Sequence, residues 1–381
     1  MQQSRRDHLT SLFAARFGGA PQLWARAPGR VDLMGSHTDY NLGYVLTMAI
    51  SRDTWIAARG NETRQVNLYA ANLDDDDCFP LGAIAKSPGK PWSNYIRGVA
   101  AVLASEGLPL RGFDAVIHSN VPLEAGVSSS AALECAAAMV FQAIGGWNLS
   151  PERMARLCQR AENQFVGVNC GILDQYSSCL GRAQSALLLD CRDLRTSTVR
   201  IAPGISVVIC NTMSRRKLSA GEYAARRADC EAGARLLGVG ALREATPAML
   251  AARRHELPEQ VAKRSEFIVA ESARAESLAR ALEAGDRTRV GALCAESFEG
   301  ARRLFEICSA AMIAMHEAIL AAPGAIGGRQ AGAGFGGCLV AFAETEAVED
   351  FRAAVEAAYT AACQTRPEIY AVEAAQGAGL L

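Results

Sequence analysis

The sequence predicts a two-domain protein of the α/β type, in which strands and helices are mixed. The chain has 381 residues, which is too long for one simple hydrophobic core. Strand-like segments occur at residues 44–51, 113–118 and 205–210, and a helix-like segment rich in Ala, Leu and Met occupies residues 131–144. A change of composition near residues 190–203 marks the candidate domain boundary.

Composition and charge exclude several classes of protein. Hydrophobic residues make up 50% of the chain and charged residues 21%, which is ordinary for a globular protein. The formal net charge is -1, so no basic excess is present to neutralise a nucleic-acid backbone. We therefore expect no nucleic-acid partner, and any bound anion must be held by local geometry.

The cysteines and the lengths of the apolar segments indicate the cellular compartment in which the protein is expected. The N-terminal residues contain no apolar core of signal-peptide length, and no uncharged run is long enough to span a membrane. The sequence has 12 cysteines but no C-x-x-C pair, so zinc ribbons and redox motifs are unsupported. We expect buried, reduced thiols in a cytoplasmic protein that has no membrane partner.

A loop of small residues between a strand and a helix is the segment most suggestive of chemistry. Residues 121–132 read V-P-L-E-A-G-V-S-S-S-A-A. The first amides of a helix lack internal partners and carry partial positive charge, which suits an anion. Gly126 permits close approach of a phosphate, and Ser128, Ser129 and Ser130 supply hydroxyls for phosphate oxygens or a divalent metal. The alternative is an ordinary serine N-cap on a buried helix.

A second segment, residues 27–50, is dense in hydrogen-bonding side chains and is divided by glycines. Seven polar residues lie within twelve positions: Arg30, Asp32, Ser36, His37, Asp39, Tyr40 and Asn41. Carboxylates accept hydrogen bonds from hydroxyl groups, and His and Arg donate them. The segment therefore suits a ligand with many hydroxyl groups, such as a sugar, and the alternative is a solvated turn region.

Four further segments carry weaker signals. Residues 331–338 form a third glycine-rich stretch, A-G-A-G-F-G-G-C, which leaves room for a ligand or another backbone. Asp174 follows a small-residue turn, where a helix N-cap is an equal alternative. Residues 74–77, four acids, are expected to form an exposed turn with no nearby cation. Residues 217–237 are expected to form a charged helix whose Arg-rich face is solvated.

Five motifs, in this order and spacing, resemble those of the GHMP kinases, and more specifically the galactokinases. They are A-P-G-R-V-D-L-M-G-S-H-T-D-Y-N, V-P-L-E-A-G-V-S-S-S-A-A-L-E, A-E-N-Q-F-V-G-V-N-C-G-I-L-D-Q, K-L-S-A-G-E-Y-A-A-R-R-A-D-C-E and A-G-A-G-F-G-G-C. The resemblance extends from about residue 17 to residue 342. It implies a two-domain fold of mixed sheets with helices, with domains at residues 1–195 and 196–381 and the active site between them.

The resemblance also implies an activity and its cofactors. The γ-phosphoryl group of ATP would be transferred to the anomeric hydroxyl of a sugar, with Mg²⁺ as the metal. The partners would be the small-molecule sugar and ATP, and the protein would be a monomer or a weak oligomer.

Site residues follow from the motifs that match. The resemblance implies that Asp174 is the general base or the carboxylate that orients the sugar, with Arg30 beside it as the second catalytic residue. The remaining roles are shared between a metal pair, a phosphate loop and a sugar-contacting set: Ser130 and Glu162 for Mg²⁺; Gly126, Ser128, Ser129 and Ser130 for the phosphates; and Ser36, His37, Asp39, Gly171 and Tyr223 for the sugar.

Four positions depart from the family pattern. Ser36 replaces a glutamate that contacts the exocyclic hydroxymethyl group of galactose, and Asp32 replaces a usual asparagine. Glu124 replaces a glycine and is expected to point outward, and Phe298 replaces a histidine. Because of Ser36, the substrate is galactose or a sugar altered at the exocyclic carbon, such as arabinose, fucose or galacturonate. A non-catalytic sugar sensor and a kinase for a non-sugar alcohol are the other hypotheses.

Overall fold

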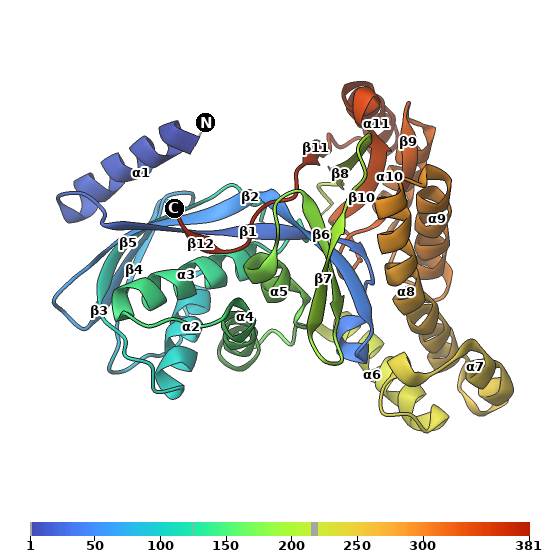
Figure 1. The fold of residues 1–381 in the computed structure, drawn as a ribbon, viewed down its shortest axis with the longest axis horizontal. Coiled ribbons are helices and arrows are strands. Elements are labelled where there is room, and N and C mark those ends of the chain that lie inside the picture. Colours follow the sequence, from blue (N-terminus) through green and yellow to red (C-terminus); the bar gives the residue numbers. More distant parts are fainter. Residues whose placement is uncertain (1, 124, 215–219) are drawn as a thin grey trace.

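The computed structural model describes residues 2–123, 125–214 and 220–381, and it contains two β-sheets that lie one after the other along the longest axis (Figure 1). The helices cover these sheets, so the predicted mixture of strands and helices is confirmed. Within these described residues, none of the helices is both long and apolar enough to cross a bilayer.

The first sheet has eight strands. Its main path runs in the order β12 (Gly379–Leu380), β1 (Leu23–Met34), β2 (Tyr44–Gly60), β5 (Phe113–Ser119), β3 (Gln65–Ala70) and β4 (Asp75–Pro80), and β6 (Ser185–Asp190) joins β2 to β7 (Arg195–Arg200). Only the β3–β5 pairing is parallel among these described strands. The long β1–β2 ladder changes register between Pro28 and Arg30 and again between Asp32 and Met34. Such irregularities redirect the side chains beside them.

Helices cover both faces of this sheet (Figure 1). One face carries α2 (Ser93–Ser105), α3 (Ser129–Gly145), α4 (Pro151–Arg160), a π-helical segment (Ala161–Val166) and α5 (Leu173–Leu180). The other carries α1 (Gln2–Phe17), which buries Leu9 and Phe13 against Trp24 and Trp55. As the sequence predicts, Pro151 opens α4, and the Ser150 hydroxyl caps this helix by accepting from the backbone amide of Arg153.

The second sheet has four strands in the order β11 (Glu368–Val372), β8 (Ile205–Asn211), β10 (Cys338–Glu344) and β9 (Ala325–Gln330), all antiparallel. The helices α9 (Arg287–Arg303), α10 (Ala310–Ala321) and α11 (Val348–Cys363) pack against it, and α8 (Glu259–Ala284) packs on α9 and on β2 of the first sheet. The helices α6 (Ala220–Leu237) and α7 (Pro247–Arg253) pack on α8. Short 3₁₀ turns occupy Asp39–Asn41, Leu242–Glu244, Arg254–Glu256 and Thr345–Ala347.

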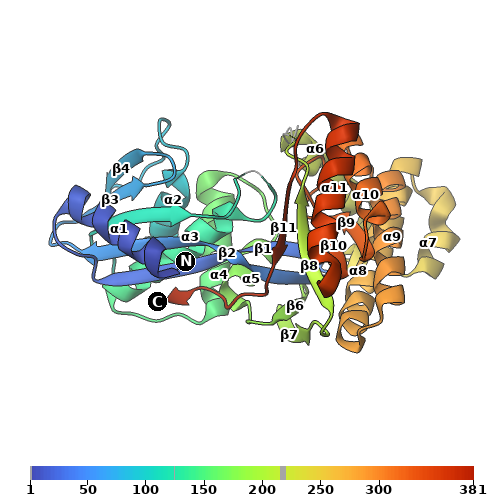
Figure 2. The ribbon, with the colours of Figure 1, turned by 90° about the horizontal axis from the view of Figure 1, so that it is seen from above.

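The two halves share one hydrophobic core at their junction. Leu33 of β1 and Met48 of β2 belong to the same buried cluster as Leu278 of α8 and Val340 of β10. The chain leaves the first sheet after Arg200 and enters the second at Ile205, and its last residues return to pair with β1 (Figure 2). The division of the chain at residues 195 and 196 stays a prediction, placed at the first residue of β7.

The prediction for residues 74–77 was wrong. Three of the four acids form the start of strand β4, and each of the three forms an ion pair with a basic side chain, Asp76 with Arg16 of α1. Asp77 makes a buried ion pair with Arg97 at 2.7 Å, and Asp75 pairs with Lys90. The partners lie on α1, on α2 and before α2, so only the folded chain brings opposite charges to this acidic run. The predictions for Glu124 and for the start of the 217–237 helix lie outside the described residues.

Candidate functional site

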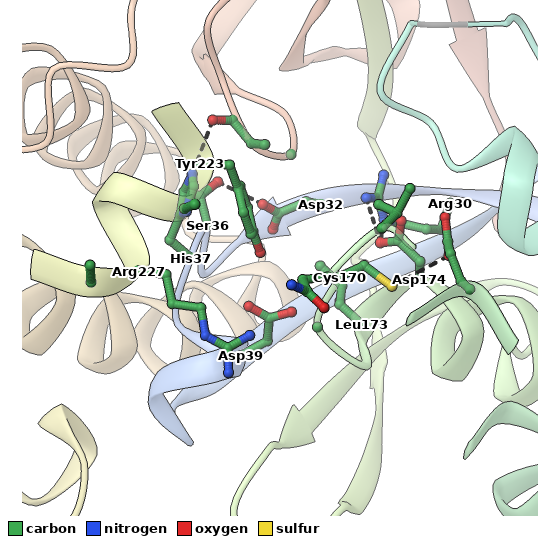
Figure 3. Close-up of a pocket in the computed structure, with 18 of the residues that line it drawn as sticks. Arg30, Asp32, Ser36, His37, Asp39, Cys170, Leu173, Asp174, Tyr223 and Arg227 are labelled. Atoms are coloured by element: carbon green, nitrogen blue, oxygen red, sulfur yellow. Dashed lines mark hydrogen bonds and ion pairs between the residues drawn. The ribbon is translucent and has the colours of Figure 1, made fainter. Parts of the chain in front are cut away.

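A cavity of about 640 Å³ lies between the first sheet and α6 (Figure 3). One part of its wall comes from β1 and the turn that follows it. The rest comes from the π-helical segment, from the loop that precedes α5, from α6 and from the third glycine stretch. Eight residues that the sequence analysis assigned to the site line it: Arg30, Ser36, His37, Asp39, Glu162, Gly171, Asp174 and Tyr223. Segments that are remote in the sequence therefore meet in one cavity.

Arg30 and Asp174 form the most direct contact in this cavity. The Arg30 Nε and Nη2 atoms donate to Asp174 Oδ1 at 2.9 and 2.6 Å, and Nη1 donates to the Gly126 carbonyl at 2.6 Å. Arg30 follows the first register change of β1, where a Cβ on Gly29 would collide with the Val127 carbonyl. Asp174 lies within the first turn of α5, whose N-cap position belongs to Ile172, so the N-cap interpretation of Asp174 was wrong.

Asp39 and Gly171 touch across the cavity wall. A Cβ on Gly171 would collide with the Asp39 carboxylate, so this contact requires glycine. Burial, helped by the negative charge of Asp174 and opposed by a hydrogen bond from the Tyr40 amide, raises the pKa of Asp39 to about 6. Hydrogen bonds donated by the hydroxyl groups of a ligand would stabilise the ionised form of such a buried carboxylate.

His37 connects the polar segment of residues 27–50 to the third glycine stretch, residues 331–338. Its Nε2 lies 3.0 Å from the Ala333 carbonyl, which only accepts, so Nε2 donates and Nδ1 accepts from the Tyr40 hydroxyl at 2.9 Å. The His37 backbone has a left-handed φ of 64°. Its ring packs against Tyr223 of α6, with the ring centroids 5.3 Å apart.

Glu162 lies on the π-helical segment and is buried beside Ser130. Burial and the negative charge of Asp174 together raise the pKa of Glu162 to about 7, although hydrogen bonds from Ser130 and Gln175 act in the opposite direction. Gln175 Nε2 donates to Glu162 Oε2 at 2.6 Å and to Glu134 Oε2 at 3.0 Å. Glu134, Glu162 and Asp174 therefore lie close together, and among the residues that the structure describes Arg30 is the cation that pairs with one of them.

The small-residue loop that contains Ser128, Ser129 and Ser130, called the serine loop below, has a backbone conformation that an ordinary serine N-cap does not require. Ser128 occupies the N-cap position of α3 but has a left-handed φ of 59° and makes no capping hydrogen bond. Its hydroxyl is buried and has no partner among the residues that the structure describes. The serine N-cap interpretation is therefore wrong. An unsatisfied buried hydroxyl and a strained backbone are features of ligand sites.

The serine loop also borders a second, more apolar pocket of about 330 Å³. Ser129 lines this pocket together with Trp92, Asn72, Leu73 and Leu133. The Trp92 indole is fixed because its Nε1 donates to Asp75 Oδ2 at 2.9 Å. Sequence reasoning did not find this pocket, since residues from β2, from the segment around Trp92 and from β11 complete it, and only the residues near the serine loop belong to a quoted motif.

The sequence analysis assigned no role to some residues in and behind the cavity. Glu134 and Gln175 lie behind Glu162, and this could have been inferred because both belong to quoted motifs, which end in L-E and D-Q. The solvated-face interpretation of the 217–237 helix was wrong at Arg227, because this side chain lines the cavity next to Tyr223 (Figure 3). Phe298 lies elsewhere and stacks on His316, with the ring centroids 3.7 Å apart.

Comparison with known families gives three matches. Residues 94–182 match the family model described as GHMP kinases N terminal domain, and residues 278–361 match GHMP kinases C terminal. Residues 11–60 match the galactokinase galactose-binding signature. The three matches contain most of the residues that line the cavity.

Full-length relatives and solved structures agree with these matches. The chain is 43% identical to a galactokinase of Roseiflexus sp. (strain RS-1), over 97% of this chain and 96% of the relative, and 42% identical to one of Chloroflexus aggregans, over 98% and 97%. It superposes on the Lactococcus lactis galactokinase complexed with galactose with a TM-score of 0.94 and 31% identity, covering 98% of this chain and 99% of that one. A mevalonate kinase at 16% identity shares the fold, with a TM-score of 0.66 over 92% and 99% of the two chains.

Proposed function

Because the chain belongs to the GHMP kinase family, we propose that its cavity phosphorylates a sugar, transferring the γ-phosphoryl group of ATP to the anomeric hydroxyl of galactose. The observation that carries this proposal is the Arg30–Asp174 pair, which lies in one cavity with the polar residues Ser36, His37 and Asp39, while Arg30 also donates to the Gly126 carbonyl of the serine loop. The galactokinases that resemble the chain cover nearly its whole length.

Asp174 and Arg30 are the proposed catalytic residues. The side chain of Asp174 is 23% exposed and that of Arg30 only 7%, so the carboxylate is the member of the pair that a substrate reaches. Asp174 would accept a hydrogen bond from the anomeric hydroxyl and orient its oxygen toward the γ-phosphorus. As the new O–P bond forms and the bond to the β-phosphate oxygen breaks, the hydroxyl proton passes to Asp174 and ADP leaves.

Arg30 has two effects on this step. It fixes the position of Asp174 through two hydrogen bonds and places positive charge beside the transferred group. Because phosphoryl transfer depends mainly on positioning and charge stabilisation, these two effects contribute more than proton abstraction.

The serine loop is the proposed phosphate site. Gly126 has a φ of 81°, which suits glycine, and the N-terminus of α3 presents unpaired amides near the unpartnered Ser128 hydroxyl. Ser129 and Ser130 add two more hydroxyls to the same loop. Together these groups would cradle the triphosphate.

Ser130 and Glu162 fit a Mg²⁺ ion. Mg²⁺ binds hard oxygen donors, commonly one or two protein side chains together with substrate phosphates and water. The Glu162 carboxylate, whose pKa is raised by burial and by the negative charge of Asp174, is a group that a cation would stabilise. When bound, Mg²⁺ supplies charge neutralisation at the phosphate oxygens.

The sugar would occupy the part of the cavity beyond Asp174. His37, Asp39, Gly171, Tyr223 and Ser36 line it, and they offer a mixture of donors and acceptors. The more apolar second pocket, on the other side of Ser129 and with Trp92 in its wall, would take the nucleotide base. In this arrangement the serine loop lies between the base and the sugar.

The deciding experiment is a coupled ADP-release assay over galactose, arabinose, fucose, galacturonate, galactosamine and mevalonate. We expect turnover to be highest with galactose and to depend on Mg²⁺. Binding of galactose by calorimetry without turnover of any compound would replace the kinase proposal by a sugar sensor. Turnover of mevalonate alone would reassign the substrate class.

We further propose a cytoplasmic protein that is a monomer or a weak oligomer. All twelve cysteines are free thiols, which suits a reducing compartment. Sedimentation of the purified protein over a range of concentrations tests the oligomeric state.

A further inference from the structure

A buried hydrogen-bonded cluster lies behind one wall of the cavity. The Ser36 hydroxyl donates to Asp32 Oδ2 at 2.7 Å and accepts from Arg329 Nη2 at 2.8 Å. Arg329, on β9, also donates to Glu271 Oε1 of α8 at 2.9 Å. Asp32, Arg329 and Glu271 are fully buried, so these contacts are not screened by bulk water.

This cluster fixes the hydrogen-bonding character of Ser36. A hydroxyl group has one proton and two lone pairs. The Ser36 proton is directed to Asp32, and one lone pair is directed to Arg329. Only acceptor capacity remains for a ligand in the cavity that Ser36 lines.

Asp32 adds a second acceptor at the same place. Its Oδ1 atom is buried and receives no hydrogen bond from any of the residues described, and the residue lines the cavity beside Ser36. The second register change of β1 lies immediately after Asp32 and turns the chain toward Ser36. Burial raises the pKa of Asp32, and the Arg329 guanidinium opposes this by favouring the ionised form.

We propose that Asp32, Ser36 and Arg329 act as one unit that selects a hydroxyl donor on the sugar, at the end remote from the reacting hydroxyl. Figure 3 shows Asp32 and Ser36 on one side of the cavity and the Arg30–Asp174 pair on the other. In a hexose that reacts at the anomeric carbon, the far end carries the exocyclic carbon. This inference rests on the proposed function and names its specificity residues.

The unit distinguishes between the substrates that the sequence left open. A hydroxymethyl group supplies the donor that two acceptors require. The methyl group of fucose leaves both acceptors unpaired, and a carboxylate, as in galacturonate, brings a third acceptor and a negative charge against Asp32. The unit therefore favours galactose over both.

A glutamate at position 36 would be incompatible with Asp32 in this cluster. It would place two buried carboxylates beside Arg329, which already pairs with Glu271. Asp32→Asn would remove one of these charges. The two positions at which the chain departs from the family signature should therefore be coupled energetically.

A double-mutant cycle tests this coupling, with Asp32→Asn, Ser36→Glu and the double variant. We expect Ser36→Glu alone to lower Tm and to raise KM for galactose roughly tenfold, the effect of about one disrupted buried polar contact. In the Asp32→Asn background, the same change should recover most of both losses. Effects of Ser36→Glu that are equal in the two backgrounds would overturn the proposal.

Sugar selectivity gives a readout that a merely structural role would not move. In Asp32→Asn the amide donates to Ser36, so the serine regains a proton for the ligand. We expect the ratio of kcat/KM for galactose to that for fucose to fall roughly tenfold, mainly through KM. Ser36→Ala, which adds no charge, should reduce the same ratio. An unchanged ratio in both variants contradicts the proposal.

Asp77→Asn is the matched control, because Asp77 is also a buried acid paired with an arginine but does not line the cavity. It should lower Tm without changing the sugar ratio. If the wild-type protein turns over no sugar, the proposed function is refuted, and the Tm values of the double-mutant cycle still test the coupling of Asp32 with Ser36. If the wild-type protein does turn over sugar but the two substitutions have additive effects on Tm, the proposed unit is refuted and the proposed function is not.

Discussion

At the scale of single residues, the site depends on a few carboxylates held in unusual surroundings. Asp174 is both paired with the Arg30 guanidinium and open to the cavity. We expect Asp174→Asn to lower kcat by at least about a hundredfold, since the amide cannot accept the proton, while nucleotide binding is retained. A coupled assay and nucleotide titration measure the two quantities, and retained turnover would remove Asp174 from its role. Asp77→Asn again serves as the control.

Glu162 gives a pH-dependent prediction at the same scale. Its pKa is raised from 4.5 to about 7 in the folded protein, so the folded state binds more protons than the unfolded state between these values. The stability of the ligand-free protein due to this group is therefore lost as pH rises through that window. The cost above pH 7 is on the order of 3 kcal/mol.

Glu162→Gln should therefore raise Tm clearly at pH 8 and little at pH 4.5, as measured by thermal unfolding without ligands. The same variant should require more Mg²⁺ for activity, since one proposed ligand is weakened. A Tm increase of equal size at both values of pH would show that ionisation of Glu162 is not the cause.

At the scale of elements, the loop before α5 sets the distance between Gly171 and Asp39. We expect Gly171→Ala to push Asp39 out of place and raise KM for the sugar roughly tenfold, with KM for ATP little changed. Initial-rate kinetics with each substrate varied in turn measure this. Gly89→Ala is a suitable control, because a Cβ at that glycine meets no atom within 4 Å. Equal changes in both Michaelis constants would argue against a local effect.

The sequence predicted which residues meet where a family motif marks them. The resemblance selected Arg30, Glu162 and Asp174, and all three line one cavity, while their catalytic and metal-binding roles stay predictions. It was wrong where a long-range contact decides, as for Asp77, whose partner Arg97 lies on another element. Likewise, a helical face that is rich in arginine is ordinarily solvated, and the packing of α6 over the cavity makes Arg227 a lining residue although its side chain is 42% exposed.

At the scale of the whole molecule, the shared core predicts cooperative unfolding. Residues from the first sheet, from α8 and from the second sheet form one buried cluster, and Arg329 connects β9 to Asp32 of β1. We expect a single calorimetric transition for the ligand-free protein, because neither half can retain this surface after the other unfolds. Two resolved transitions would show that the halves unfold independently.

The last strand has a consequence for synthesis in the cell. Leu380 pairs with Ala25, and the Leu381 amide donates to the Trp24 carbonyl at 2.9 Å, so the final residues cover the outer border of the first strand (Figure 2). On the ribosome, β12 emerges long after β1, because almost every other element of the chain lies between them. The nascent first half must therefore keep that border uncovered until β12 has also been synthesised and has left the ribosome.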